Sequence, residues 1–163
     1  MSDLKLQPNA LRSAFAAFPT GVVAICGVDS DSSSPIGMSV NSFTSVSLDP
    51  PLVAVCTAKT SRTWPKLREI GEVGISVLGS SQEFTSRQLA AKEGDRFADI
   101  LWTSDGKRVF LEDAALWISA TFSEEFHAGD HYIAIFEVLG LERFHERQPL
   151  IFHNSKYWQI ENS

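Results

Sequence analysis

The sequence is short of cysteine, of basic residues and of long apolar runs, and each shortage argues against a class of protein. Two cysteines in 163 residues cannot make the disulfide framework of a small secreted domain. The 14 lysines and arginines are outnumbered by 20 acidic residues, and the resulting net charge of −6 argues against nucleic acid as a partner. No apolar run approaches the roughly 20 residues that span a bilayer, so no membrane is expected.

Several familiar motifs are also missing. No G-x-G-x-x-G or G-x-x-x-x-G-K-[ST] loop is present, so a nucleotide would have to be held in another way. No serine lies in a G-x-S-x-G elbow, which argues against serine hydrolase chemistry. His127, Asp130 and His131 could be drawn as a metal site, but a turn separates them and a third clear ligand is lacking, so no metal is predicted.

The composition is that of a globular protein. With 44% hydrophobic and 21% charged residues, the chain is expected to form a single domain over residues 1–163 with a real core. Cys26 and Cys56 lie in apolar runs, where reduced thiols are commonly buried. The first residues lack a basic and then apolar signal, so a cytoplasmic protein is expected.

Hydrophobic periodicity predicts mostly strands. Apolar or alternating runs indicate strands at 21–26, 52–57, 73–78, 116–126 and 131–139, with two short strands near 149–152 and 157–160. Three short helices are expected: one capped by Asn9 with a buried stripe, one starting at Thr63, and one running from Ser80 to about Lys92. Residues 95–109 are expected to form a surface loop. Hairpins at 21–41 and 116–139 favour a small β-barrel with peripheral helices over a doubly wound sheet.

The stretch from Gly37 to Pro51 begins as a strand and then collects small polar side chains. It contains Ser39, Asn41, Ser42, Thr44, Ser45 and Ser47. One interpretation is a polar turn between two strands, which is the simpler one from the residues alone. The other is a wall against a flat, heteroatom-rich ligand, with Met38, Val40 and Phe43 as the apolar surface under a bound ring.

Two further positions suggest ligand contacts. Ser61, Arg62 and Thr63 stand at a predicted helix start, where hydroxyl and guanidinium groups could hold a phosphate. The alternative is that Thr63 only caps the helix while Ser61 and Arg62 face water. His131 follows Gly129 and Asp130 at a strand mouth, where an imidazole could meet the edge of a ligand.

Taken together, these motifs resemble the flavin reductase-like family, in particular the small reductase component of two-component flavin-dependent monooxygenases. The resemblance is carried by the blocks 18–22, 37–52, 61–63, 129–131 and 149–152, which follow in the family's order and spacing. It implies a mainly β fold, a split β-barrel of the FMN-binding type, usually a homodimer. It also implies an enzyme that uses NADH or NADPH to reduce FMN or FAD and passes reduced flavin to a separate monooxygenase.

The resemblance also assigns residues. Those implied to contact the flavin ring and its attached chain are Met38, Ser39, Val40, Asn41, Ser42, Thr44 and Ser45, with Cys56 and Thr57 beside it through their backbone. Ser61, Arg62 and Thr63 would hold the phosphate, and Phe97, together with Arg96, would lie near the flavin. Gly129, Asp130 and His131 match the motif that faces the nicotinamide, with His131 as the catalytic group that positions it.

Two alternatives stay open at this stage. A split-barrel protein that binds flavin or heme without turnover would serve as a carrier or sensor. A relative of pyridoxamine-phosphate oxidase would share the barrel and act on that amine.

Overall fold

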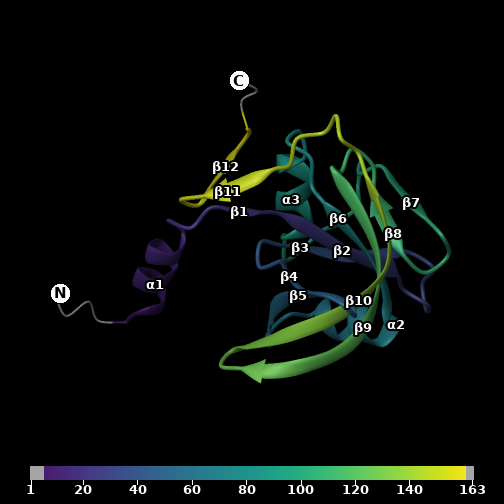
Figure 1. The fold of residues 1–163 in the computed structure, drawn as a ribbon, viewed down its shortest axis with the longest axis horizontal. Helices are drawn as coiled ribbons and strands as arrows, with labels where there is room; N and C mark the ends of the chain where they lie inside the picture. The colour runs from purple at the N-terminus through teal and green to yellow at the C-terminus, as the bar shows by residue number, and fades with distance from the viewer. Residues whose placement is uncertain (1–5, 161–163) are drawn as a thin grey trace.

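β-strands predominate over helices in residues 6–160, the part of the chain that this computed structural model describes (Figure 1). The helices of this part are α1 (Pro8–Phe15), α2 (Trp64–Ile70) and α3 (Glu83–Leu89), and none of them is long and apolar enough to cross a bilayer. The strands are β1 (Thr20–Gly21), β2 (Val23–Val28), β3 (Pro35–Val40), β4 (Thr44–Leu48), β5 (Pro51–Ala58), β6 (Glu72–Val77), β7 (Trp102–Ser104), β8 (Val109–Leu111), β9 (Leu116–Ala128), β10 (His131–Arg143), β11 (Ile151–His153) and β12 (Lys156–Trp158). The expected mainly β fold is confirmed.

Seven strands form one antiparallel sheet that encloses the main core. Their order is β3-β2-β6-β9-β10-β5-β4. Met38 of β3 and Val55 of β5 belong to one apolar cluster with Trp64 and Leu67 of α2. In a flat sheet these two strands would be far apart, because neighbouring strands lie roughly 4.8 Å from each other. The sheet therefore curves around this core.

A second apolar cluster lies on the opposite face of β2. Ala24 and Cys26 of β2 pack there with Leu89 of α3 and Leu150, while the alternate residues of β2 face the main core. Burial on both faces explains why this strand is apolar without alternation. Burial also raises the pKa of the Cys26 thiol far above its usual value.

The predicted hairpins are confirmed, and the strands β4, β7 and β8 were missed. β2 pairs with β3, and β9 pairs with β10 along most of their lengths. The polar stretch after β3 is not only a turn, because Thr44–Leu48 forms the edge strand β4 against β5. The expected loop at 95–109 contains β7, the turn after it and the first residue of β8, and the two strands pair as a hairpin.

Two of the helix starts differ from those predicted, while α2 follows Thr63 as expected. α1 begins at Pro8 after Gln7, not after Asn9, and none of its residues is buried, so the expected buried stripe is wrong. α3 begins at Glu83 and ends at Leu89. Its N-cap is Gln82 in place of Ser80. The Gln82 amide oxygen accepts from the backbone N–H of Gly79, and its NH₂ group donates to the carbonyl of Glu112.

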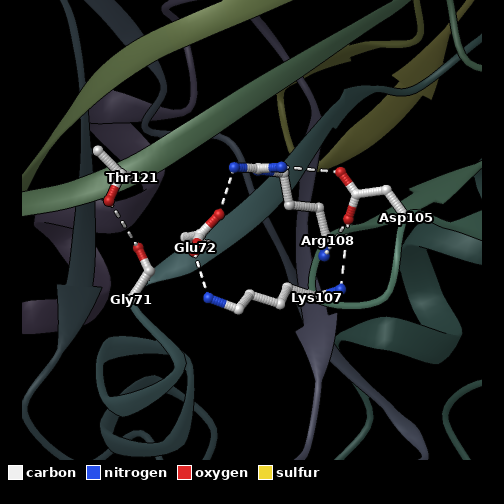
Figure 2. A network of polar contacts seen from close by, with 6 residues as sticks. All are labelled: Gly71, Glu72, Asp105, Lys107, Arg108 and Thr121. Carbon is white, nitrogen blue, oxygen red and sulfur yellow. Dashed lines mark hydrogen bonds and ion pairs between the residues drawn. The ribbon is translucent and has the colours of Figure 1, made fainter.

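An ion-pair network attaches the β7–β8 hairpin to β6 (Figure 2). The Glu72 carboxylate accepts hydrogen bonds from Lys107 and Arg108, and Arg108 also pairs with Asp105 at 2.8 Å. The hydrogen bond from Lys107 is the main reason that the pKa of the Glu72 carboxyl lies below its usual value. Ionised Glu72 therefore stabilises the attachment of this hairpin.

We expect Glu72→Gln to lower the free energy of unfolding near neutral pH. A carboxyl with a lowered folded-state pKa stabilises the fold above its unfolded pKa of about 4.3, and this contribution is lost as the pH falls through the folded pKa. The difference between wild type and variant should therefore shrink below about pH 4 in urea titrations. Glu83→Gln, which removes a single exposed pair with Arg87, is the control with a smaller effect. A difference that is the same at every pH would contradict the role of Glu72.

Candidate active site

A cleft of about 540 Å³ lies between the start of α2, the end of α3 and strand β3. Its lining includes Met38, Ser39, Ser61, Arg62 and Thr63 from the motifs found in the sequence. Its volume is within the roughly 300–1,000 Å³ usual for small-molecule sites. Two motifs that are about twenty residues apart in the chain thus meet in one hollow.

The cleft is rich in cations although the chain is acidic overall. Lys92 and Arg96 join Arg62 in its lining, and Glu93 is the acidic side chain there. Arg96 Nη1 donates to Thr63 Oγ1 at 2.6 Å and to the carbonyl of Gly37 at 3.4 Å. Guanidinium groups fixed in this way favour a bound phosphate.

The start of α2 is organised differently from the prediction. Thr63 is the N-cap residue but makes no capping hydrogen bond with its side chain, since its hydroxyl accepts from Arg96. The Ser61 hydroxyl accepts from the backbone N–H of Trp64 at 3.1 Å instead. An anion at this position would therefore be held mainly by the cationic side chains.

The hydroxyls of the polar stretch have structural partners. Ser39 Oγ donates to the carbonyl of Ser86 in α3 at 2.8 Å. Ser42 Oγ donates to the carbonyl of Cys56 at 3.0 Å and accepts from its N–H at 2.9 Å. The Ser39 bond fixes β3, part of the cleft wall, against α3, and the Ser42 bonds fix the segment after β3 against β5.

The other residues assigned to flavin lie around the cleft in different ways. Val40 and Asn41 line a neighbouring hollow of about 150 Å³. Ser39 lines both this hollow and the cleft. Thr44 and Ser45 are exposed on the edge strand β4 and do not line the cleft. Cys56 is exposed, on the same face of β5 as Ala58 of the cleft.

The last two residues assigned to flavin are Thr57, which is buried, and Phe97, which is half-buried. The Thr57 side chain is 2% exposed, and its hydroxyl is buried without a hydrogen-bond partner among the described residues. Phe97 packs on the second apolar cluster. A Cβ at Gly37 would lie 2.5 Å from Cys26 Sγ and 3.0 Å from Phe97 Cζ, so only glycine fits at the head of the polar stretch.

The motif 129–131 forms the turn of the β9–β10 hairpin, whose tip extends beyond the body of the sheet (Figure 1). His131 pairs with Ala58 of β5, and Ala58 lines the cleft, so strand register brings the motif beside it. Lys59 fixes the turn with two hydrogen bonds. Its Nζ donates to the carbonyl of Gly129 at 2.7 Å, and its backbone N–H donates to the carbonyl of Asp130 at 3.0 Å.

Asp130 orients the imidazole of His131. Its carboxylate accepts a hydrogen bond from His131 Nδ1 at 2.8 Å, and this bond is the main reason that the pKa of Asp130 lies below its usual value. Because Nδ1 carries the proton, Nε2 is the nitrogen left for a ligand. The imidazole is thus prepared to bind and orient a polar group.

Sequence reasoning missed two of the cations in this region, Lys59 and Lys92, which carried no signal. Arg96 was expected near the flavin, but only through the family resemblance and together with Phe97. Lys92 and Arg96 follow α3, about thirty residues after Arg62, and their approach depends on how α3 packs on β3. A cationic patch made of scattered residues has no local pattern.

Comparison with known proteins places the chain in one family. The flavin reductase like domain family matches residues 15–161. A "probable flavin reductase" of Rhizobium meliloti is 43% identical over 137 residues, which are 83% of this chain and 43% of that protein. The reductase subunit of a flavin-dependent monooxygenase of Rhodococcus jostii is 32% identical over 158 residues, 96% of this chain and 80% of its own. The chain thus spans less than half of the first relative and most of the second.

A solved structure agrees in fold and sequence. It is the NADH:FAD oxidoreductase of Streptomyces globisporus in complex with NAD and FAD fragments. That structure superposes with a TM-score of 0.86 at 31% identity, over 93% of this chain and 91% of its own. This chain belongs to the flavin reductase like domain family.

Proposed function

We propose that this protein reduces FMN or FAD with NADH or NADPH and supplies the reduced flavin to a separate monooxygenase. The observation that carries the proposal is the 540 Å³ cleft, where the motif 61–63, the polar stretch and three cationic side chains meet beside the motif 129–131. Membership of the family agrees with it, and the Rhodococcus relative is named as a monooxygenase subunit.

The residues of the cleft fit a flavin. Arg62, Lys92 and Arg96 suit its phosphate, while Met38 gives apolar surface for a flat ring. A bound flavin would accept a hydride from the nicotinamide and carry the electrons to the partner. The chain's own work is to hold that phosphate, keep the polar stretch in place through Ser39 and Ser42, and exclude water.

The proposal is tested by following oxidation of NADH and of NADPH in air while FMN or FAD is titrated. We expect turnover that depends on added flavin, with the preferred flavin and nucleotide apparent from the rates. Flavin binding without oxidation of either nucleotide would favour a carrier or sensor instead. Oxidation of pyridoxamine phosphate would point to the third candidate.

His131 is proposed to position the nicotinamide and not to act as an essential base. We expect His131→Ala to raise KM for the pyridine nucleotide roughly fivefold to tenfold, the value of one lost hydrogen bond, while kcat changes by less than about twofold. His127→Ala is the matched control, since His127 is in the same hairpin and its ring makes an edge contact with Tyr132 at a centroid distance of 5.0 Å. A large fall in kcat at an unchanged KM would contradict the positioning role.

We also propose a single split-barrel domain that pairs into a homodimer. The curved seven-stranded sheet supports the split barrel. Large apolar side chains are exposed on several elements, including Phe15 at 71%, Phe18 at 74%, Leu48 at 92% and Leu141 at 69%, and a second copy would cover part of them. Sedimentation equilibrium checks the assembly, and a monomer at micromolar concentration would contradict it. The free thiols of Cys26 and Cys56 agree with a reducing compartment such as the cytoplasm.

A further inference from the structure

A second hollow borders the proposed flavin cleft. This hollow has a volume of about 280 Å³ and lies between α2 and the segment 94–97, next to β3. It shares Arg62, Thr63 and Arg96 with the 540 Å³ cleft. Arg96 bonds both Thr63 and the carbonyl of Gly37, so it is fixed at the junction. Two guanidinium groups thus stand where the hollows meet.

The lining of the second hollow suits a nucleotide. Ile36 and Phe97 offer apolar surface for a base. The Lys66 ammonium, which pairs with Asp29 at 3.0 Å, offers a charge for a phosphate. The Asp95 carboxylate is an acceptor for ribose hydroxyls, a pairing that recurs in nucleotide sites. At 280 Å³ the hollow is small for a separate drug-sized ligand but adequate for an extension of one bound next door.

We propose that this second hollow receives the adenosine monophosphate half of FAD, and that the protein therefore binds FAD more tightly than FMN. The inference rests on the proposed function, which puts the flavin ring in the 540 Å³ cleft and its phosphate at the junction. FMN ends at that phosphate, so it leaves the second hollow empty. FAD continues through a second phosphate to ribose and adenine, and it gains contacts that FMN lacks.

The test is the dissociation constant of each flavin, measured by quenching of flavin fluorescence without any nucleotide present. We expect the Kd for FAD to lie at least about tenfold below that for FMN. Lys66→Glu should raise the Kd for FAD about tenfold and leave that for FMN within about twofold. The Lys66 side chain is 59% exposed, so the change affects no buried contact, and loss of its surface pair with Asp29 is controlled by Lys66→Met, which loses the same pair.

Two further variants control for charge and for folding. Lys156→Glu changes the net charge by the same amount on exposed β12, outside the hollow, and should leave both constants unchanged. Lys66→Met keeps the alkyl chain and should weaken FAD alone, though less than the reversal does. Equal affinity for the two flavins, or an equal effect of Lys66→Glu on both, would overturn the inference while leaving the reductase proposal intact. Failure to bind either flavin would overturn both.

Discussion

Arg96→Ala is expected to weaken binding of both FMN and FAD by about 10-fold to 100-fold. Arg96 stands at the junction where the phosphate shared by both flavins is proposed to lie, and hydrogen bonds to charged groups contribute roughly 1.5–3 kcal/mol. The variant also removes the bonds that Arg96 makes to Thr63 and Gly37, so the junction loses its rigidity as well as its charge. Flavin titration by fluorescence quenching gives both constants.

The control for Arg96 is Arg143→Ala. Arg143 is exposed at the end of β10 and lines neither hollow, so its loss changes the net charge equally without touching the site. Thermal unfolding of both variants separates weak binding from damage to the fold. Flavin affinities that are unchanged in a folded Arg96→Ala protein would show that the phosphate lies elsewhere.

Trp64→Ala is expected to lower the free energy of unfolding by about 3–5 kcal/mol, as for other large aromatic residues truncated in a core. Trp64 is 1% exposed, and its ring makes edge contacts with Phe122 and Phe136 at centroid distances of 5.7 and 6.0 Å. Its Nε1 donates to Glu125 at 3.0 Å, so truncation also removes a partner of a carboxylate that is mostly buried. A loss of this size is a large fraction of the roughly 5–15 kcal/mol that stabilises a typical domain.

Urea unfolding followed by circular dichroism measures this loss. Trp158→Ala is the matched control, because Trp158 is 52% exposed and its Nε1 donates to the carbonyl of His153 at the surface. We expect the control to cost less than about 1 kcal/mol. Similar losses in the two variants would mean that α2 does not anchor the core. Since Trp64 directly follows Thr63, the first variant should weaken flavin binding as well.

The sequence predicted the central strands well because their burial leaves a clear mark. β2 is buried on both faces and reads as a continuous apolar run, while Ile118 and Ala120 of β9 show the alternation of a strand with one buried face. β4 and β7 left no such mark, because almost all their side chains are exposed and they are held by pairing with β5 and β8. Whether such an exposed strand forms depends on its partner strand, which the local sequence pattern does not indicate.

Long-range contacts explain the other differences. Gln82 is the N-cap residue of α3 without a capping side-chain bond, and its amide is held instead by Gly79 and by Glu112, a partner thirty residues away that no local pattern indicates. The amphipathic pattern of α1 correctly indicated a helix, but it could not say what covers the apolar face. In the site, the motifs were visible in sequence, whereas the approach of Arg96 to Thr63 depends on tertiary packing.

The most direct test of the account is a crystal structure of the protein grown with FAD. We predict the flavin ring beside Met38 and Ser39, and the phosphate within hydrogen-bond distance of Arg62 and Arg96. A flavin bound in another hollow, such as the one beside Trp117 and Gly140, would contradict the assignment of the 540 Å³ cleft and every prediction built on it.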